Sequence, residues 1–140
     1  MVTAILTIPS CDPGQYGYWY IENQLEEDII VTRSDTTEIH YVYIPVGGSG
    51  LIYAEGGGLT TGIDDLIQSF CYIYKQDTLV HDTLVIMNGD LDTLYKLHPP
   101  HRNEKDGTEL NKEFWDINFW DSAVEYRRTS THTIFIYRLE

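Results

Sequence analysis

Histidine side chains are the first candidates for chemistry in this sequence, because imidazole binds metal ions and exchanges protons near neutral pH. The chain contains five: His40, His81, His98, His101 and His132. Only His98 and His101 lie close together, and the two prolines between them hold that segment extended. A zinc site needs about four ligands, so this pair requires others from elsewhere in the fold. Histidines at a surface or strand edge are more common, and we expect no metal site and no cofactor.

Carboxylates are the most abundant candidates for acid–base chemistry. The chain carries 22 Asp and Glu against 9 Lys and Arg, which gives a net charge of −13. Two carboxylates about 5 to 9 Å apart can hydrolyse a glycosidic bond, but no pair stands out in the sequence. The motifs G-x-S-x-G, S-x-x-K and H-E-x-x-H do not occur. We therefore predict no catalytic residue and no enzymatic activity.

The same charge argues against nucleic acid as a partner, because no cluster of Lys and Arg is present to neutralise phosphates. Arg127-Arg128 is the only adjacent basic pair. The carboxylates are spread from Asp12 to Glu140, and Glu26-Glu27-Asp28 is their only run of three. This spread is typical of a solvated surface rather than of a nucleic-acid mimic.

Two glycine-containing loops suggest ligand binding but depart from the known patterns. Gly56-Gly57-Gly58 precedes an expected helix, yet it lacks the lysine and the glycine spacing of phosphate-binding loops. Asp90 and Asp92 follow Asn88-Gly89 without the glycine and glutamate positions of an EF-hand. We interpret the first loop as a linker and the second as a hairpin turn.

Aromatic side chains point to binding. The chain has eleven Tyr, three Trp and four Phe, and Tyr and Trp supply rigid contact area at low entropic cost. Tyrosines at alternate positions along a strand lie on one face and would form a platform for sugar rings or for a protein partner. The alternative is that the strand tyrosines fill the sheet faces and the core; they are Tyr16, Tyr18, Tyr20, Tyr41, Tyr43, Tyr72 and Tyr74.

Short strands separated by turns must position these residues. Residues 16–23 are apolar on both faces, which predicts a central strand. Residues 38–44 alternate, with Tyr41 and Tyr43 on one face and His40 on the other. The glycine-rich residues 45–50 predict a hairpin onto residues 51–54. Further strands are expected at residues 29–33, 71–76, 83–87, 91–97, 124–127 and 131–139.

One helix is expected at about Ile63 to Phe70, because its apolar residues recur with helical spacing. Residues 101–112 are polar and predict an exposed loop. Residues 113–120 are rich in aromatics and predict a short helix or a loop anchored in the core. Short strands with frequent turns predict a mainly β chain, an antiparallel β-sandwich with one short helix, as a single domain over residues 12–140.

The N-terminus bears on location. Val2 to Ile8 is an apolar run without charge that ends in Pro9-Ser10-Cys11. A hydrophobic run that closes on a cysteine resembles a lipobox, in which the thiol is acylated. The basic residues that normally precede such a run are missing, since Arg33 is the first in the chain. We interpret residues 1–11 as a truncated signal with Cys11 as the lipid anchor.

Two alternatives to this interpretation stay open. Ala4 to Ile8 would also suit a first β-strand, since it is short and apolar. A Cys11 without lipid would be free or would form a disulfide with Cys71 in an oxidising compartment.

Four features carry a resemblance over nearly the whole chain. They are the cysteine-led start, the aromatic strand running into residues 20–31, the glycine-rich turn at residues 46–51 followed by 64–74, and the closing segment 118–139. Together they resemble small bacterial envelope lipoproteins with an immunoglobulin- or transthyretin-like β-sandwich. The resemblance implies an envelope location and a sandwich fold, and it carries no catalytic motif.

The expected function follows from these observations. We expect a cell-envelope domain that is lipid-anchored through Cys11 and serves binding or structure, with a protein or a glycan as partner. One alternative is a cytoplasmic or phage-type acidic inhibitor that binds a basic protein surface. A carbohydrate-binding module is the third possibility.

Overall fold

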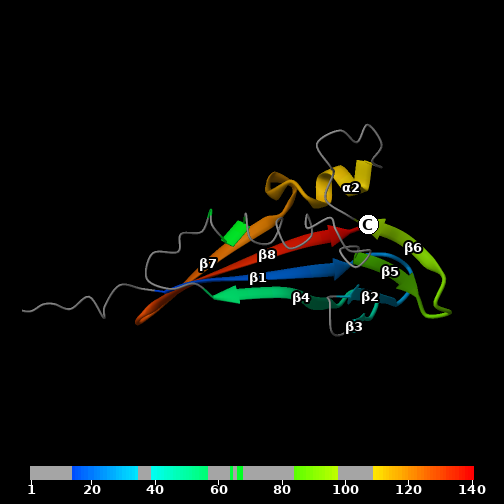
Figure 1. Ribbon diagram of the computed structural model, residues 1–140, viewed down its shortest axis with the longest axis horizontal. Coiled ribbons are helices and arrows are strands. Elements are labelled where there is room, and N and C mark those ends of the chain that lie inside the picture. Colours follow the sequence, from blue (N-terminus) through cyan, green and yellow to red (C-terminus); the bar gives the residue numbers. More distant parts are fainter. Residues whose placement is uncertain (1–13, 35–38, 57–63, 65, 68–83, 98–108) are drawn as a thin grey trace, which may run out of the picture.

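The computed structural model describes residues 14–34, 39–56, 64, 66–67, 84–97 and 109–140 (Figure 1). These residues form mostly strands, together with the short α-helix α2, three helical residues at 64, 66 and 67, and one turn of 3-10 helix. The elements are β1 (Gly14–Asn23), β2 (Ile29–Ser34), β3 (Ile39–Ile44), β4 (Ser49–Gly56), β5 (Leu84–Asn88), β6 (Thr93–Leu97), α2 (Glu109–Phe114), η2 (Ile117–Phe119), β7 (Asp121–Arg127) and β8 (Ser130–Leu139). The predicted mainly β fold class is confirmed.

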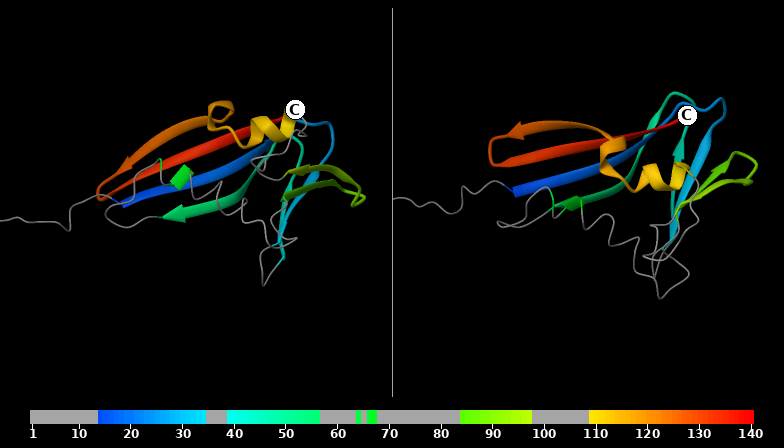
Figure 2. Two further views of the ribbon diagram at one scale, coloured as in Figure 1. Left: turned by 45° about the horizontal axis from the view of Figure 1, so that its top comes forward. Right: turned by 90° about the horizontal axis from the view of Figure 1, so that it is seen from above.

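The strands form two sheets of four that pack on each other as a sandwich (Figure 2). Sheet A has the order β4-β1-β8-β7, and sheet B has the order β3-β2-β5-β6. β1 lies between β4 and β8, which confirms the central position predicted from its apolar residues. β1 and β8 run parallel, whereas the other described strand pairs are antiparallel as expected. The first and last described strands therefore lie side by side in the middle of sheet A (Figure 1).

The predicted hairpin at residues 45–50 is wrong. β3 pairs with β2 and β4 pairs with β1, so this turn carries the chain from sheet B to sheet A. Glycine content identified a turn correctly, and Gly47 adopts a φ of +76° that favours glycine. It could not identify the partner of the strand that follows, because pairing depends on contacts distant in sequence.

A buried asparagine holds this crossing in place. Asn23 ends β1 and is 0% exposed. Its Nδ2 donates to the carbonyl oxygens of Ile44 at 3.1 Å and Glu27 at 2.8 Å, and its Oδ1 accepts from Leu25 N at 2.9 Å. Its backbone carbonyl also accepts from Gly47 N at 2.8 Å. One side chain thus joins the end of β1 in sheet A to the end of β3 in sheet B.

The core lies between the sheets and is built on the rings of β1 and β8. Trp19 is 0% exposed, and its ring stacks on Phe135 with centroids 4.9 Å apart. Gly17 makes room for that ring, because a Cβ at this position would lie 2.6 Å from Trp19 Cζ3. Sheet B supplies aliphatic residues to the same cluster, including Ile29, Val31, Ile44, Leu84, Ile86 and Leu97.

The segment before β7 closes one end of the core. Residues 109–112 were expected in an exposed loop, but they belong to α2, which begins at Glu109. The expected anchoring of the aromatic residues that follow is confirmed, since Phe114 and Trp120 are both buried. Trp120 Nε1 donates to the carbonyl of Phe114 at 2.8 Å, and the Phe114 ring meets the edge of Tyr137 at 5.2 Å.

Several predictions concern residues that lie outside the described part of the chain. Of the expected helix at 63–70, Asp64, Leu66 and Ile67 are described and helical, and Leu66 packs in the core. The N-terminal segment with Cys11 and the expected strand at 71–76 are not described. The hairpin expected at Asn88-Gly89 is confirmed, since it joins the antiparallel strands β5 and β6.

Candidate ligand-binding face

The histidines considered for metal binding are placed only in part. His40 lies on β3 in sheet B and His132 on β8 in sheet A, while His81, His98 and His101 fall outside the described residues. Among the described residues, no group of three or more His, Cys, Asp or Glu is close enough to hold a metal ion.

Three tyrosines share the outer face of sheet A. Burial alternates along β1, with Gly17, Trp19, Ile21 and Asn23 facing the core. Tyr16, Tyr18 and Tyr20 therefore project to the opposite face. The parallel register places them beside His132, Ile134 and Ile136 of β8, and Leu51 of β4 pairs with Tyr20 on the other side. We call this set of seven residues the tyrosine face.

The Tyr16 end of the tyrosine face is held in place by His132. The Tyr16 ring stacks on it with centroids 4.8 Å apart and planes 9° apart, and Tyr18 lies nearly parallel at 5.7 Å. His132 Nδ1 is 2.9 Å from Tyr18 Oη, and Nε2 is 2.8 Å from Ser130 Oγ. Both partners are hydroxyl groups that donate or accept, so either neutral tautomer is satisfied. These contacts leave His132 only 6% exposed and hold the surrounding rings in place.

A glycine on the neighbouring strand also positions Tyr16. A Cβ on Gly56 of β4 would lie 2.4 Å from Tyr16 Cε1, so the ring lies directly against the β4 backbone. The Tyr16 ring is thus held between Gly56 and His132, and it still keeps 36% of its surface exposed. It offers a ligand a ring that needs little further ordering.

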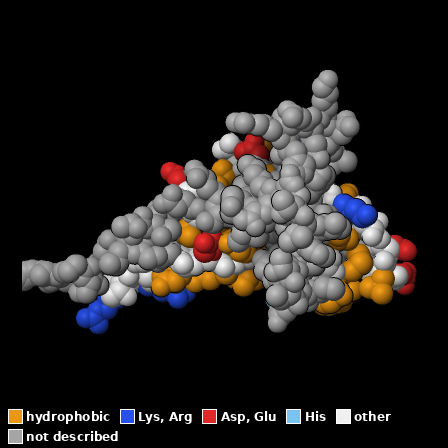
Figure 3. Space-filling model, in the orientation of Figure 1, with side chains coloured by type: hydrophobic (Ala, Val, Ile, Leu, Met, Phe, Trp, Pro, Cys, Tyr) orange, Lys and Arg blue, Asp and Glu red, His pale blue; other side chains and the backbone are white. Residues whose placement is uncertain are grey.

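The tyrosine face continues into an open groove at the seam between the sheets. This seam groove has a volume of about 520 Å³ and is lined by His40, Tyr41 and Val42 of β3 and by Leu51, Ile52, Tyr53 and Ala54 of β4. Leu51 belongs to both surfaces, and Ala54 pairs with Tyr18. A row of hydrophobic side chains follows the lower border of the molecule, where β4 lies (Figure 3).

Two exposed tyrosines stand on the outer face of β3, and one of them, Tyr41, lines the seam groove. Tyr41 is 65% exposed and Tyr43 is 60% exposed, so neither fills the core. Tyr43 Oη donates to Asp28 Oδ2 at 2.5 Å, and Val46 N donates to Asp28 Oδ1 at 2.9 Å. The Tyr43 bond raises the pKa of Tyr43 and, with the Val46 bond, lowers the pKa of Asp28. The turn between β3 and β4 is thereby tied to the turn before β2.

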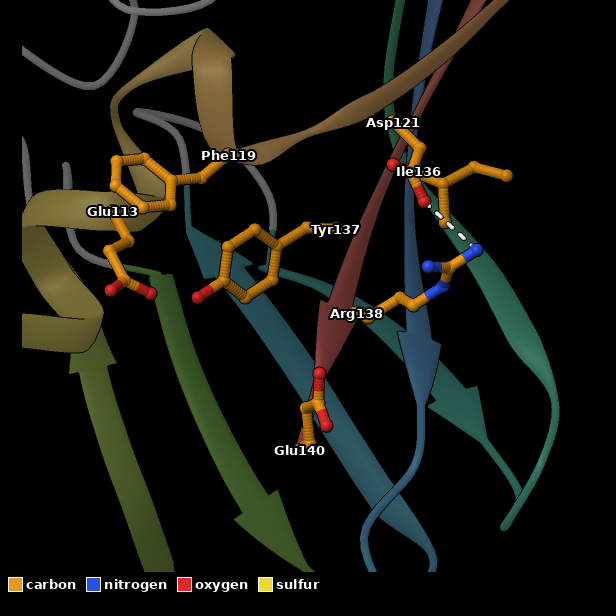
Figure 4. A pocket seen from close by; sticks show the side chains of 7 residues that line it. All are labelled: Glu113, Phe119, Asp121, Ile136, Tyr137, Arg138 and Glu140. Carbon is orange, nitrogen blue, oxygen red and sulfur yellow. Dashed lines mark ion pairs between the residues drawn. The ribbon is translucent and has the colours of Figure 1, made fainter.

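Charged side chains border the other end of the tyrosine face. Arg138 of β8 bonds Glu22 through Nε at 3.0 Å and Asp121 through Nη2 at 2.9 Å. Beyond it lies a hollow of about 210 Å³ that also takes in Glu113, Phe119, Tyr137 and Glu140 (Figure 4). Burial, and after it the negative charge of Glu113, raises the pKa of Tyr137 to about 12.

The tyrosines thus divide into core and surface residues. Tyr53 and Tyr137 are buried, while Tyr16, Tyr41, Tyr43 and Tyr126 are exposed. Alternation along the expected strands placed Tyr41 and Tyr43 on one face but did not say which face meets solvent. The contact between Tyr16 and His132 could not be predicted from neighbouring residues, because 116 positions of sequence separate the two.

Within the described residues, the helices are too short or too polar to cross a membrane. No protein-family model matches this chain, and no match was found among curated proteins or solved structures.

Proposed function

We propose that this chain is a non-catalytic binding domain that holds its ligand on the tyrosine face and in the adjoining seam groove. The observation that carries the proposal is the row of Tyr16, Tyr18 and Tyr20 on the outer side of sheet A. A solvated sheet face normally carries polar residues in alternation with the core. Here the outer positions of β1 hold aromatic rings, and His132 and Gly56 fix one of them in place.

A neutral oligosaccharide is the ligand class that this surface suits best. The C–H groups of a sugar ring pack against the electron-rich face of an aromatic ring. The seam groove adds a concave surface that is lined by apolar and aromatic side chains with a few polar groups. The net charge of −13 disfavours acidic glycans, because two surfaces of like charge repel.

Location at a bacterial cell envelope through a lipid on Cys11 remains part of the proposal and rests on the sequence alone. Membrane fractionation of natively expressed protein, followed by mass spectrometry of the N-terminus, tests it. An acylated Cys11 in the membrane fraction supports the anchor. An unmodified Met1 in the cytosolic fraction would rule it out.

A glycan array with the purified chain tests the ligand class, and isothermal titration then measures the affinity for the best sugar. Tyr41→Ala and Tyr20→Ala should each weaken binding about tenfold, a typical loss for an aromatic contact residue. Leu91→Ala is the control, because Leu91 is 64% exposed in the turn between β5 and β6, away from the face. Silence across the array, together with binding to basic proteins, would favour the acidic inhibitor instead.

A further inference from the structure

Strand β7 is an edge of sheet A among the described strands. It lies last in the order of sheet A, and of the described strands it pairs with β8 alone. All seven of its residues are exposed, and in Figures 1 and 2 it forms the outer border of the sheet. Proteins usually protect such edges with a proline, a bulge or an inward-facing charge.

β7 lacks a proline, a bulge and an inward-facing charge, and its charged side chains, Asp121, Glu125 and Arg127, all lie on the outer face. Its sequence, DSAVEYR, contains no proline, and it pairs with β8 over seven residues without a shift in register. The opposite edge, β4, does carry an irregularity, where its register with β1 shifts between Trp19 and Tyr20. Asp121, Glu125 and Arg127 share the outer face of β7, so Ser122, Val124 and Tyr126 leave the inner face uncharged.

The backbone groups that β7 directs outward follow from its hairpin. Arg127 and Ser130 flank the two-residue turn Arg128-Thr129, and such a flanking pair exchanges both hydrogen bonds. Alternate residues from Arg127 back to Asp121 therefore bond to β8. The N–H and C=O groups of Ser122, Val124 and Tyr126 consequently point away from the sheet, ready to receive another strand.

We infer that β7 pairs with β7 of a second copy of this chain, antiparallel and with the two-fold axis at Val124. This register joins the three outward-facing residues of each strand by about six hydrogen bonds. It places Val124 opposite Val124 and Ser122 opposite Tyr126. Asp121 then stands opposite Arg127 of the second copy at both ends of the paired strands. Opposite charges in such cross-strand positions stabilise the pair.

The charge pattern of β7 selects this register. Moving the axis one residue toward the N-terminus places Asp121 opposite Glu125, and moving it one residue the other way places Glu125 opposite Glu125. Both shifts oppose like charges. With the axis at Val124, Glu125 stands opposite Ala123 and keeps its ion pair with Arg127 Nε at 3.2 Å.

A second copy also suits the local charge and the inner face of β7. Residues 121–128 carry two acidic and two basic side chains, so this segment is neutral in a chain of net charge −13. Tyr126 is 80% exposed and Val124 is 49% exposed. Both line an open groove of about 560 Å³ that also contains Trp120, Phe135 and Ile117. Tyr126 of one copy, opposite Ser122 of the other, would cover part of this apolar groove.

The test is the molar mass of the full chain in solution, measured by light scattering and sedimentation over a range of concentrations. The chain has a mass of 16.2 kDa, and the inference requires a reversible dimer of twice that mass. Val124→Pro removes an outward N–H but no bond to β8, and it should weaken dimerisation at least tenfold. Val124→Thr keeps the N–H and is the matched control.

Charge reversal provides a second test that does not depend on proline. Arg127→Asp places two acidic side chains opposite each other at each end of the paired β7 strands and should weaken the dimer. Adding Asp121→Arg to the same chain should restore it. Circular dichroism confirms that each variant keeps its strands. A wild-type chain that stays monomeric at about 100 μM would overturn the inference. Its dissociation constant would then lie well above the micromolar range of ordinary protein association. A dimer unaffected by Val124→Pro and by the charge reversals would also overturn it.

Discussion

Asn23 allows a prediction whose magnitude can be worked from the structure. Its side chain makes three hydrogen bonds, to the carbonyl oxygens of Ile44 and Glu27 and from the backbone N–H of Leu25. Each contributes about 1 kcal/mol net, so Asn23→Ala should lower the free energy of unfolding by about 3 kcal/mol. A domain of this kind has only about 5 to 15 kcal/mol in total.

Urea denaturation, followed by tryptophan fluorescence, measures this loss as a lower midpoint with an unchanged m-value. Asn23→Asp is a sharper probe, because it keeps the acceptor for Leu25 and places an anionic oxygen against two carbonyls. It should cost more than the alanine change. Gln24→Ala is the control, since the Gln24 side chain makes an exposed bond to Glu22. A loss below about 1 kcal/mol for Asn23→Ala, or an equal loss for Gln24→Ala, would refute the role assigned to Asn23.

Three further changes test the core, the tyrosine face and the response to pH. Gly17→Ala places a Cβ 2.6 Å from the Trp19 ring and should cost about 1 to 3 kcal/mol by overpacking, measured by urea denaturation. Gly56→Ala should push Tyr16 off its stack on His132, which would shift the His132 ring-proton signals in NMR spectra and weaken ligand binding. The folded-state pKa of Tyr137 is raised from 10.0 to about 12, so its stabilising contribution is complete below pH 10 and is lost as the pH rises toward 12. Tyr137→Phe should flatten the fall in stability over that window, and an unchanged pH profile would contradict this cause.

The sequence predicts local structure in this chain better than it predicts pairing. Along β8, strict alternation separates the buried Thr133, Phe135, Tyr137 and Leu139 from the outer residues, as expected from the pattern. The turn at residues 45–50 was recognised from glycine, but its role was misjudged, because a turn into the other sheet has the same local composition. The start of α2 was missed because residues 109–112 stand in a polar segment, whereas a short helix or a loop was expected from residue 113 on.

The candidate site shows the same limit. Its tyrosines were singled out, since aromatic residues on alternate strand positions have a recognisable pattern. The residues of β8 that join this face were not foreseeable, because their position depends on β1 pairing in parallel with the last described strand. The parallel register brings Tyr16 beside His132, and no local propensity encodes a contact over such a separation. Gly56 was interpreted as part of a linker, although its role here is to leave room for the Tyr16 ring.

The proposed lipid on Cys11 and the proposed pairing of β7 would together restrict how the molecule meets a membrane. Cys11 precedes Gly14 by three residues, so the chain allows its Cα to lie at most about 10 Å from the start of β1. Gly14 N donates to Thr129 O at 3.3 Å, which places this point beside the β7–β8 turn, where Arg127 ends β7 and Arg128 begins the turn. When β7 pairs antiparallel with β7 of the second copy, the first residues of the two β1 strands lie at opposite ends of the dimer. A dimer whose strands stand perpendicular to the membrane could therefore insert only one lipid. Both lipids reach one bilayer only when the two-fold axis runs along the membrane normal. Sheet A then lies parallel to the membrane, and both tyrosine faces point to the same side, where a single extended ligand can bridge them.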